Sequence, residues 1–108
     1  MKLYIGGTFQ GQDELARSEN PNARILYAFH ETVREAVRNG RDPRDFAKAI
    51  CESMPDAVIT ADEVGSGVVP VSEEDRAYRE SVGRALCVVA QFSEQVTRTV
   101  CGIGVRIK

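Results

Sequence analysis

Apolar positions along this 108-residue chain follow two spacings, one typical of short buried strands and one typical of helices. Residues 2–6 are mostly apolar and predict a first strand, and a helix is expected to begin after Gly11 and to run to about Ser18. The Asn-Pro-Asn sequence at residues 20–22 breaks that helix. The chain therefore begins with a strand, a glycine-containing turn and a short helix.

Residues 23–39 fit two descriptions. Apolar residues recur through this stretch at helical spacing, which predicts one helix with Gly40 as its C-cap. Residues 25–29 taken alone also fit a short strand, so both assignments stay open at this point.

The middle of the chain contains a clear helix start and a buried strand. Asp42 is the expected N-cap and Pro43 the first helical residue, and Pro55 ends the helix. Residues 57–61 are nearly all apolar, as expected for a strand buried on both faces of a parallel sheet. The apolar face of the helix carries Phe46, Ala47, Ile50 and Met54.

The last third of the chain predicts a loop, a long helix and a final strand. Residues 65–67 and Pro70 mark the loop, and Ser72 with the acids after it starts the helix. A last strand is expected from about Val96 to Cys101, and residues 102–107 close the chain. The inner face of the helix is expected to carry Tyr78, Val82, Ala85, Leu86, Val89 and Phe92.

Strands that alternate with helices predict an α/β fold, a small three-layer domain with a mainly parallel sheet and flanking helices. The absence of a repeat or a low-complexity linker favours one domain over residues 1–108.

Composition narrows the classes of function. Fourteen Lys and Arg against sixteen Asp and Glu leave a net charge of −2, so no nucleic-acid partner is expected. No apolar run approaches the ~20 residues of a membrane span, and the apolar start is too short for a secretory signal. We therefore expect a cytoplasmic protein without membrane contact.

The three cysteines, Cys51, Cys87 and Cys101, are odd in number and lack a C-x-x-C pair. This predicts small buried side chains rather than disulfides or a zinc site.

The glycine-rich turn carries the strongest candidate chemistry. Gly6 and Gly11 have the spacing of the G-x-x-x-x-G-K-[ST] loop, in which backbone N–H groups surround a phosphate. Gln12 stands at the lysine position and Asp13 at the Ser/Thr position, so the cation for the outer phosphates and the hydroxyl for Mg²⁺ are both missing. The alternative is a turn and helix cap that keeps only the shape of such a loop. The candidate nucleotide- or phosphate-binding residues are Gly6, Gly7, Thr8, Phe9, Gln10, Gly11, Gln12 and Asp13.

Three later segments resemble one family. Residues 62–70, Asp-Glu-Val-Gly-Ser-Gly-Val-Val-Pro, resemble the N-E-V-G-x-G-x-V-P segment of the adenosylcobinamide kinase / adenosylcobinamide-phosphate guanylyltransferase family of cobalamin biosynthesis. Residues 78–84 resemble its F-R-D-x-x-G-R helix, and residues 101–108 its S-G-I-G-V-K-I-K carboxyl end. The resemblance covers residues 57–108 well and residues 1–13 in outline.

The resemblance implies a P-loop fold and a two-step chemistry. The family phosphorylates the hydroxyl of cobinamide's aminopropanol arm and then transfers GMP through a guanylylated histidine. It implies GTP or ATP with Mg²⁺ as cofactors wherever activity is retained, and a nucleotide or a corrinoid as ligand. A second candidate loop follows the strand of residues 57–61 beside the glycine loop, where open α/β sheets bind ligands, and Glu63 there is a candidate to hold a ribose hydroxyl, a metal ion or an amine. The alternative is a glycine turn in which Glu63 bonds only to local backbone. The residues of this second loop are Glu63, Gly65, Ser66 and Gly67, and the resemblance implies that Arg84 faces the site from the long helix. The alternative for Arg84, and for Arg79, is a side chain that is solvated or paired with Glu80 or Asp75.

The chain also departs from the family pattern. It is shorter than a full member between the glycine loop and residue 57, where the family carries its Mg²⁺-associated acid and its nucleophilic histidine. Asp62 and Leu86 replace asparagines of the full-length pattern. The residues around His30 lack the family's histidine motif, and we expect its imidazole to lie on a helix surface or to be half-buried. No catalytic residue and no resident metal site is assigned.

These departures predict a shortened, catalytically degenerate relative that binds nucleotide or phosphate weakly or acts in assembly in corrinoid metabolism. Two alternatives stay open. One is an active nucleotide-dependent kinase or nucleotidyltransferase of adenosylcobalamin biosynthesis, with an unusual loop or residues from a second subunit in a homo-oligomer. The other is a structural partner subunit that completes another protein's site.

Overall fold

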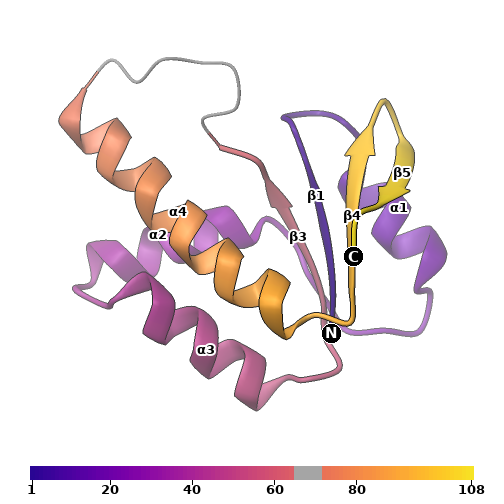
Figure 1. The fold of residues 1–108 in the computed structure, drawn as a ribbon, viewed down its shortest axis with the longest axis horizontal. Coiled ribbons are helices and arrows are strands. Elements are labelled where there is room, and N and C mark those ends of the chain that lie inside the picture. The colour runs from indigo at the N-terminus through magenta and orange to yellow at the C-terminus, as the bar shows by residue number, and fades with distance from the viewer. Residues whose placement is uncertain (65–71) are drawn as a thin grey trace.

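One five-stranded sheet, in the order β2-β3-β1-β4-β5, is the centre of the computed structural model, which describes residues 1–64 and 72–108 (Figure 1). β1 runs parallel to β3 on one side and to β4 on the other, and β2 runs parallel to β3. β5 is antiparallel to β4. The mainly parallel α/β fold is therefore confirmed. The strands are β1 (Lys2–Gly6), β2 (Ile25–Leu26), β3 (Val58–Asp62), β4 (Gln95–Val100) and β5 (Ile103–Arg106).

Helices cover the two faces of the sheet unequally. α1 (Gln12–Glu19) lies on one face, and α2 (Phe29–Arg38), α3 (Pro43–Ser53) and α4 (Glu73–Phe92) lie together on the other (Figure 1). Successive side chains of β1 point to opposite faces of the sheet, so this one strand contributes to the packing against the helices on both faces. Leu3 is fully buried in the core under α2, α3 and α4, whereas Tyr4 packs with Ala16 of α1.

The predicted helix ends are confirmed by their hydrogen bonds. The Asp42 carboxylate accepts from the backbone N–H groups of the second and third residues of α3, and the Ser72 hydroxyl accepts from the N–H of Asp75. Gly40 has a φ of 82°, and its N–H donates to the carbonyl of Val37. Glycine suits this position because it adopts positive φ without a steric cost.

Three expectations need correction. The single helix over residues 23–39 is wrong, since residues 25–26 form the edge strand β2 and the helix begins only at Phe29. Phe92 is 46% exposed rather than internal, because the buried positions at the end of α4 are Val89 and Ser93. The last expected strand is followed by a further one, the returning strand β5 of a hairpin, made possible by positive φ angles of 51° at Cys101 and 77° at Gly102.

The cysteines are not equivalent. Only Cys51 is buried, and Cys87 and Cys101 are exposed on the outer side of α4 and in the hairpin turn. The expectation of three buried thiols is therefore wrong for two of them. None of the helices in the two described segments is long and apolar enough to cross a membrane.

Candidate functional site

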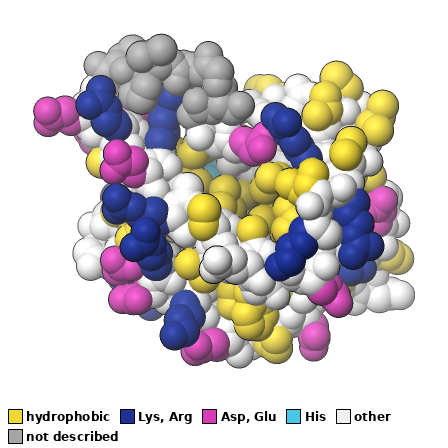
Figure 2. All heavy atoms as spheres, viewed as in Figure 1, with side chains coloured by type: hydrophobic (Ala, Val, Ile, Leu, Met, Phe, Trp, Pro, Cys, Tyr) yellow, Lys and Arg dark blue, Asp and Glu magenta, His cyan; other side chains and the backbone are white. Residues whose placement is uncertain are grey.

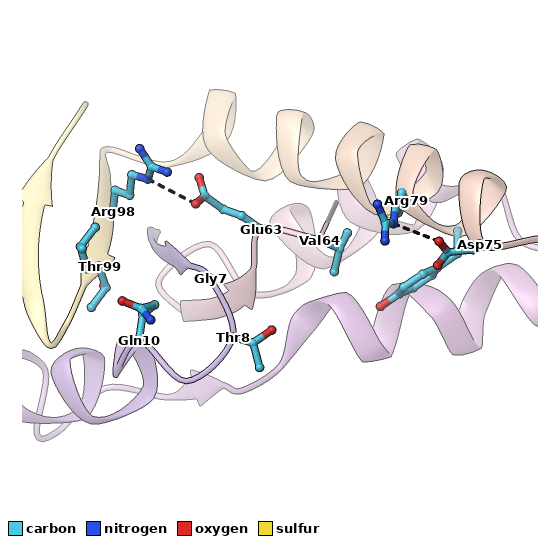
Figure 3. Close-up of a pocket in the computed structure, with 11 residues that line it drawn as sticks. Gly7, Thr8, Gln10, Glu63, Val64, Asp75, Arg79, Arg98 and Thr99 are labelled. Atoms are coloured by element: carbon cyan, nitrogen blue, oxygen red, sulfur yellow. Dashed lines mark hydrogen bonds and ion pairs between the residues drawn. The ribbon is translucent and has the colours of Figure 1, made fainter. Parts of the chain in front are cut away.

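The carboxyl ends of β1, β3 and β4 meet at one end of the sheet, where the glycine loop of residues 7–11 leaves β1. β1 lies between β3 and β4, so the connections that leave the strands run to opposite sides of β1. Such a reversal of strand order is a topological switch point, where open α/β sheets bind ligands. A cleft of about 470 Å³ opens beside the loop (Figure 3). Its lining includes Gly7, Thr8 and Gln10 of the loop, Glu63 and Val64 after β3, Asp75, Tyr78 and Arg79 of α4, and Arg98, Thr99 and Val100 of β4.

Two glycines give the loop its path. A Cβ at Gly6 would lie 2.7 Å from the carbonyl oxygen of Thr99, so no side chain fits between β1 and β4 at this point. Gly11 is the N-cap of α1 with a φ of 91°, and a Cβ there would lie 3.2 Å from the Cα of Gly102. The end of β1 therefore lies close against β4, and the loop lies against the turn of the carboxyl-terminal hairpin.

Gln12 points under the loop. Its Nε2 donates to the carbonyl oxygens of Gly6, Gly7 and Ala61 at 3.2–3.4 Å and to Oδ1 of Asp62 at 2.8 Å. The side chain is almost fully buried, and its Oε1 has no hydrogen-bond partner among the described residues. At the position of the lysine of a phosphate-binding loop, this chain thus has a neutral amide that binds its own backbone.

His30 is buried against the end of β3, so the expected surface or half-buried imidazole is wrong. Its Nδ1 accepts a hydrogen bond from the backbone N–H of Asp62 at 3.0 Å. A neutral imidazole that accepts at Nδ1 carries its proton on Nε2. Nε2 lies 3.6 Å from a carboxylate oxygen of Asp62 and 3.7 Å from one of Glu31. In this arrangement neither ring nitrogen has a free lone pair for a nucleophilic attack or for a metal ion.

Two ion pairs lie on either side of the cleft (Figure 3). Arg98 of β4 donates to Glu63 at 3.2 Å, and Arg79 of α4 pairs with Asp75 at 3.3 Å. Burial, together with the nearby carboxylate of Glu31, raises the pKa of the Tyr78 phenol. Tyr78 is therefore a neutral hydrogen-bonding group at the cleft wall at physiological pH. The cleft combines guanidinium, carboxylate and hydroxyl groups in one cavity.

The structure separates the predicted site residues into two groups. Gly7, Thr8, Gln10 and Glu63 line the cleft. Phe9, Gln12 and Asp13 instead line a cavity of about 240 Å³, together with Glu14, His30 and Asp62, and Thr8 lines both cavities. None of the described residues that line this second cavity is a lysine or an arginine, so it is acidic.

Arg84 lies apart from both cavities. It pairs with Glu80 at 3.8 Å, on the outer side of α4 beside Cys87. The pairing alternative stated for Arg79 and Arg84 is thus what the structure has, with Asp75 and Glu80 as the respective partners. Gly65, Ser66 and Gly67 of the predicted second loop lie outside the described residues.

Sequence reasoning missed the contribution of β4. Arg98, Thr99 and Val100 were expected only as part of a strand, yet they form one wall of the cleft. The signal was present, because residues at the carboxyl end of a parallel strand next to the loop must meet at the same edge of the sheet. The neighbour of β1 could not be identified without the strand order.

The donors near the loop do not fit a Mg²⁺ site of the phosphate-loop type. Asp13 replaces the hydroxyl, and the Asp62 carboxylate already accepts from Gln12 and Thr8. Within residues 1–64 and 72–108, no group of three or more His, Cys, Asp or Glu side chains is arranged to hold a metal ion.

Comparison with known proteins gives one consistent result. A family model described as cobinamide kinase / cobinamide phosphate guanyltransferase matches residues 21–107. The bifunctional adenosylcobalamin biosynthesis proteins CobU of Escherichia coli strain K12 and Salmonella typhimurium strain LT2 are 39% and 38% identical to this chain over 61 residues. These residues are 56% of this chain and 34% of each relative, so the match spans about a third of the length of the curated relatives.

Proposed function

Because the chain belongs to the cobinamide kinase / cobinamide phosphate guanyltransferase family, we propose that it binds a phosphate ester of corrinoid metabolism at the glycine loop without transferring its phosphate. The ligand is a nucleotide or a phosphorylated corrinoid, which share the phosphate group. The family resemblance of the sequence is confirmed, and the loss of phosphate transfer that the sequence predicts remains a proposal.

The observation that carries the proposal is the position of Gln12. A lysine at this point would offer an ammonium group to the outer phosphates, and hydrogen bonds to charged groups are worth about 1.5–3 kcal/mol. The side-chain amide of Gln12 instead donates its hydrogen bonds to a loop carbonyl and to the Asp62 carboxylate. Loss of the lysine contact alone corresponds to a roughly 10- to 150-fold weaker affinity for a triphosphate.

The loop nevertheless keeps a site for a single phosphate. α1 begins directly after Gly11 without a side-chain cap, so its first N–H groups remain open to an anion. Arg98 lines the cleft beside the loop, where it pairs with Glu63. Asp13 and Glu14 in the first turn of α1 already complement the helix dipole and oppose a highly charged ligand. This balance favours weak binding of a monoanionic or dianionic ester over tight binding of a triphosphate.

Titration calorimetry with GTP, ATP and cobinamide phosphate, each with Mg²⁺, tests the proposal. We expect weak binding without turnover for the natural chain, and a gain of at least tenfold in GTP or ATP affinity for the double variant Gln12→Lys, Asp13→Ser. A matched control is Gln91→Lys, Asp56→Ser, which makes the same changes at exposed positions away from the cleft. Phosphate transfer by the natural chain would contradict the proposal. Silence of both the natural chain and the loop variant toward every phosphate would remove the loop as a site.

A further inference from the structure

β5 leaves one edge of the sheet open. It pairs only with β4 among the described strands, with Val105 opposite Arg98 and Ile103 opposite Val100. The N–H of Ile107 donates to Val96 of β4, so the backbone groups of alternate residues, Ile103 and Val105, also point toward β4. The N–H and C=O groups of the intervening residues, Gly104 and Arg106, therefore point to the open edge.

The same strand carries an unusual row of exposed apolar side chains. Ile103, Val105 and Ile107 are 68%, 54% and 59% exposed and share one face of the strand. Figure 2 shows hydrophobic side chains gathered at the tip of the β4–β5 hairpin, at the upper right of the view. On the opposite face the Leu15 side chain of α1 comes close to the strand, since a Cβ at Gly104 would lie 2.7 Å from it. An open edge with an apolar row is a template for another strand.

We propose that a second copy of this chain pairs with it, strand β5 against strand β5 in antiparallel orientation, so that the two sheets become continuous. If Gly104 of each copy faces Arg106 of the other, every outward backbone group of the edge finds a partner. A two-fold axis then passes beside Val105, as an isologous contact requires. This inference concerns a different surface from the phosphate site and does not depend on it.

The side chains of this register are self-complementary. Val105 faces Val105 of the partner, and Ile103 faces the partner's Ile107, so each cross-strand pair on the exposed face is apolar. Such pairs are the unit of sheet stabilisation, and like charges directly opposite each other destabilise. If each residue paired with a residue two positions closer to the carboxyl end of the other copy, the two Arg106 side chains would lie opposite each other. If each paired with a residue two positions closer to the hairpin turn, Arg106 would lie opposite the turn of the other copy, where no strand continues.

The cations near the edge are held within their own copy. Arg106 donates through Nε to the carbonyl of Lys108, and the Lys108 ammonium donates to the last carbonyls of α4, those of Ala90 and Gln91. Their charges are thus directed away from the open backbone groups. The facing side chain at Gly104 is absent, which leaves room for the Arg106 stem of the partner.

The size of the contact sets the expected affinity. A stable complex of standard size buries ~800 Å² on each partner, about an eighth of the 6476 Å² surface of this chain. A strand of four residues with one apolar row covers less than this. We therefore expect a dimer with a dissociation constant of tens of micromolar, about −6 kcal/mol.

Sedimentation equilibrium over about 1 to about 500 µM tests the pairing. Val105→Lys places two ammonium groups at the two-fold axis and should weaken the dimer at least tenfold. Val100→Lys is the matched control, since Val100 has similar exposure and lies on the same face but on the inner strand β4. It should change the dissociation constant less than twofold. A monomer at all concentrations, or equal effects of the two variants, would overturn the proposal.

A charge pair tests the register itself. Ile103→Glu and Ile107→Lys should each weaken the dimer. The double variant should restore it, because the new carboxylate at position 103 of one copy then faces the new ammonium group at position 107 of the other. Circular dichroism checks that each variant folds, which the exposure of both positions favours. A double variant that dimerises no better than either single variant would refute this register.

Discussion

The amide of Gln12 ties the glycine loop to the end of β3, and a single-atom change tests how much depends on it. In Gln12→Glu, a carboxylate replaces the amide and faces the carbonyls of Gly6 and Gly7 and the Asp62 carboxylate, with which Nε2 now bonds. A buried charge without a donor costs more than about 2 kcal/mol. We expect the free energy of unfolding in urea to fall by at least this amount at pH 7.

The loss should shrink as the pH falls toward 4, because a protonated carboxyl group can again donate one hydrogen bond. Gln91→Glu makes the same substitution at an exposed position of α4 and should change the stability by less than about 0.5 kcal/mol. Equal losses for the two variants, or a loss at Gln12 that does not depend on pH, would show that the amide network contributes little.

At the scale of the element, sequence patterns identify a strand or a helix best where local chemistry decides. The caps at Asp42 and Ser72 and the buried strand near residues 58–62 depend on nearby residues, and all three were predicted. β2 has only two residues and is a strand because β3 lies beside it, so its local pattern was ambiguous. The hairpin turn requires a cysteine with a φ of 51°, a conformation that residue type does not indicate.

The contact between the glycine loop and this hairpin gives a prediction at the same scale. The backbone carbonyl of Gln10 accepts from the N–H of Gly102 at 2.7 Å, and its side-chain Oε1 accepts from the N–H of Cys101 at 2.8 Å. Gln10→Ala removes only the second bond. Amide hydrogen exchange should therefore accelerate at Cys101, by about fivefold for a bond worth about 1 kcal/mol, while Gly102 keeps its protection. Equal acceleration at both amides would mean that the side chain orders the whole turn, and no change would mean that its bond is not stabilising.

At the scale of the whole molecule, the sequence predicted part of the lining of the cleft. The fixed spacing of its glycines indicated the loop, and the position of Glu63 after a buried strand indicated that residue. The roles of Arg98 and His30 follow from the strand order and from a backbone hydrogen bond, both of which join residues far apart in the chain. Those relations depend on tertiary packing, so no local pattern in the sequence specifies them.

The packing of the two layers also predicts how the fold responds to alkaline pH. Burial raises the pKa of Tyr4, Cys51 and Tyr78 above 10.0, 9.0 and 10.0, their values when exposed. Their contribution to stability is therefore complete below pH 9 and is lost as the pH rises through the folded-state pKa values. Tyr4→Phe should flatten the fall in the free energy of unfolding between pH 9 and 11, by at most about 1.4 kcal/mol per pH unit. Val33→Ala, a buried change without a titrating group, should lower stability but leave the slope unchanged, and equal slopes for all three proteins would exclude Tyr4 as a source of the alkaline loss.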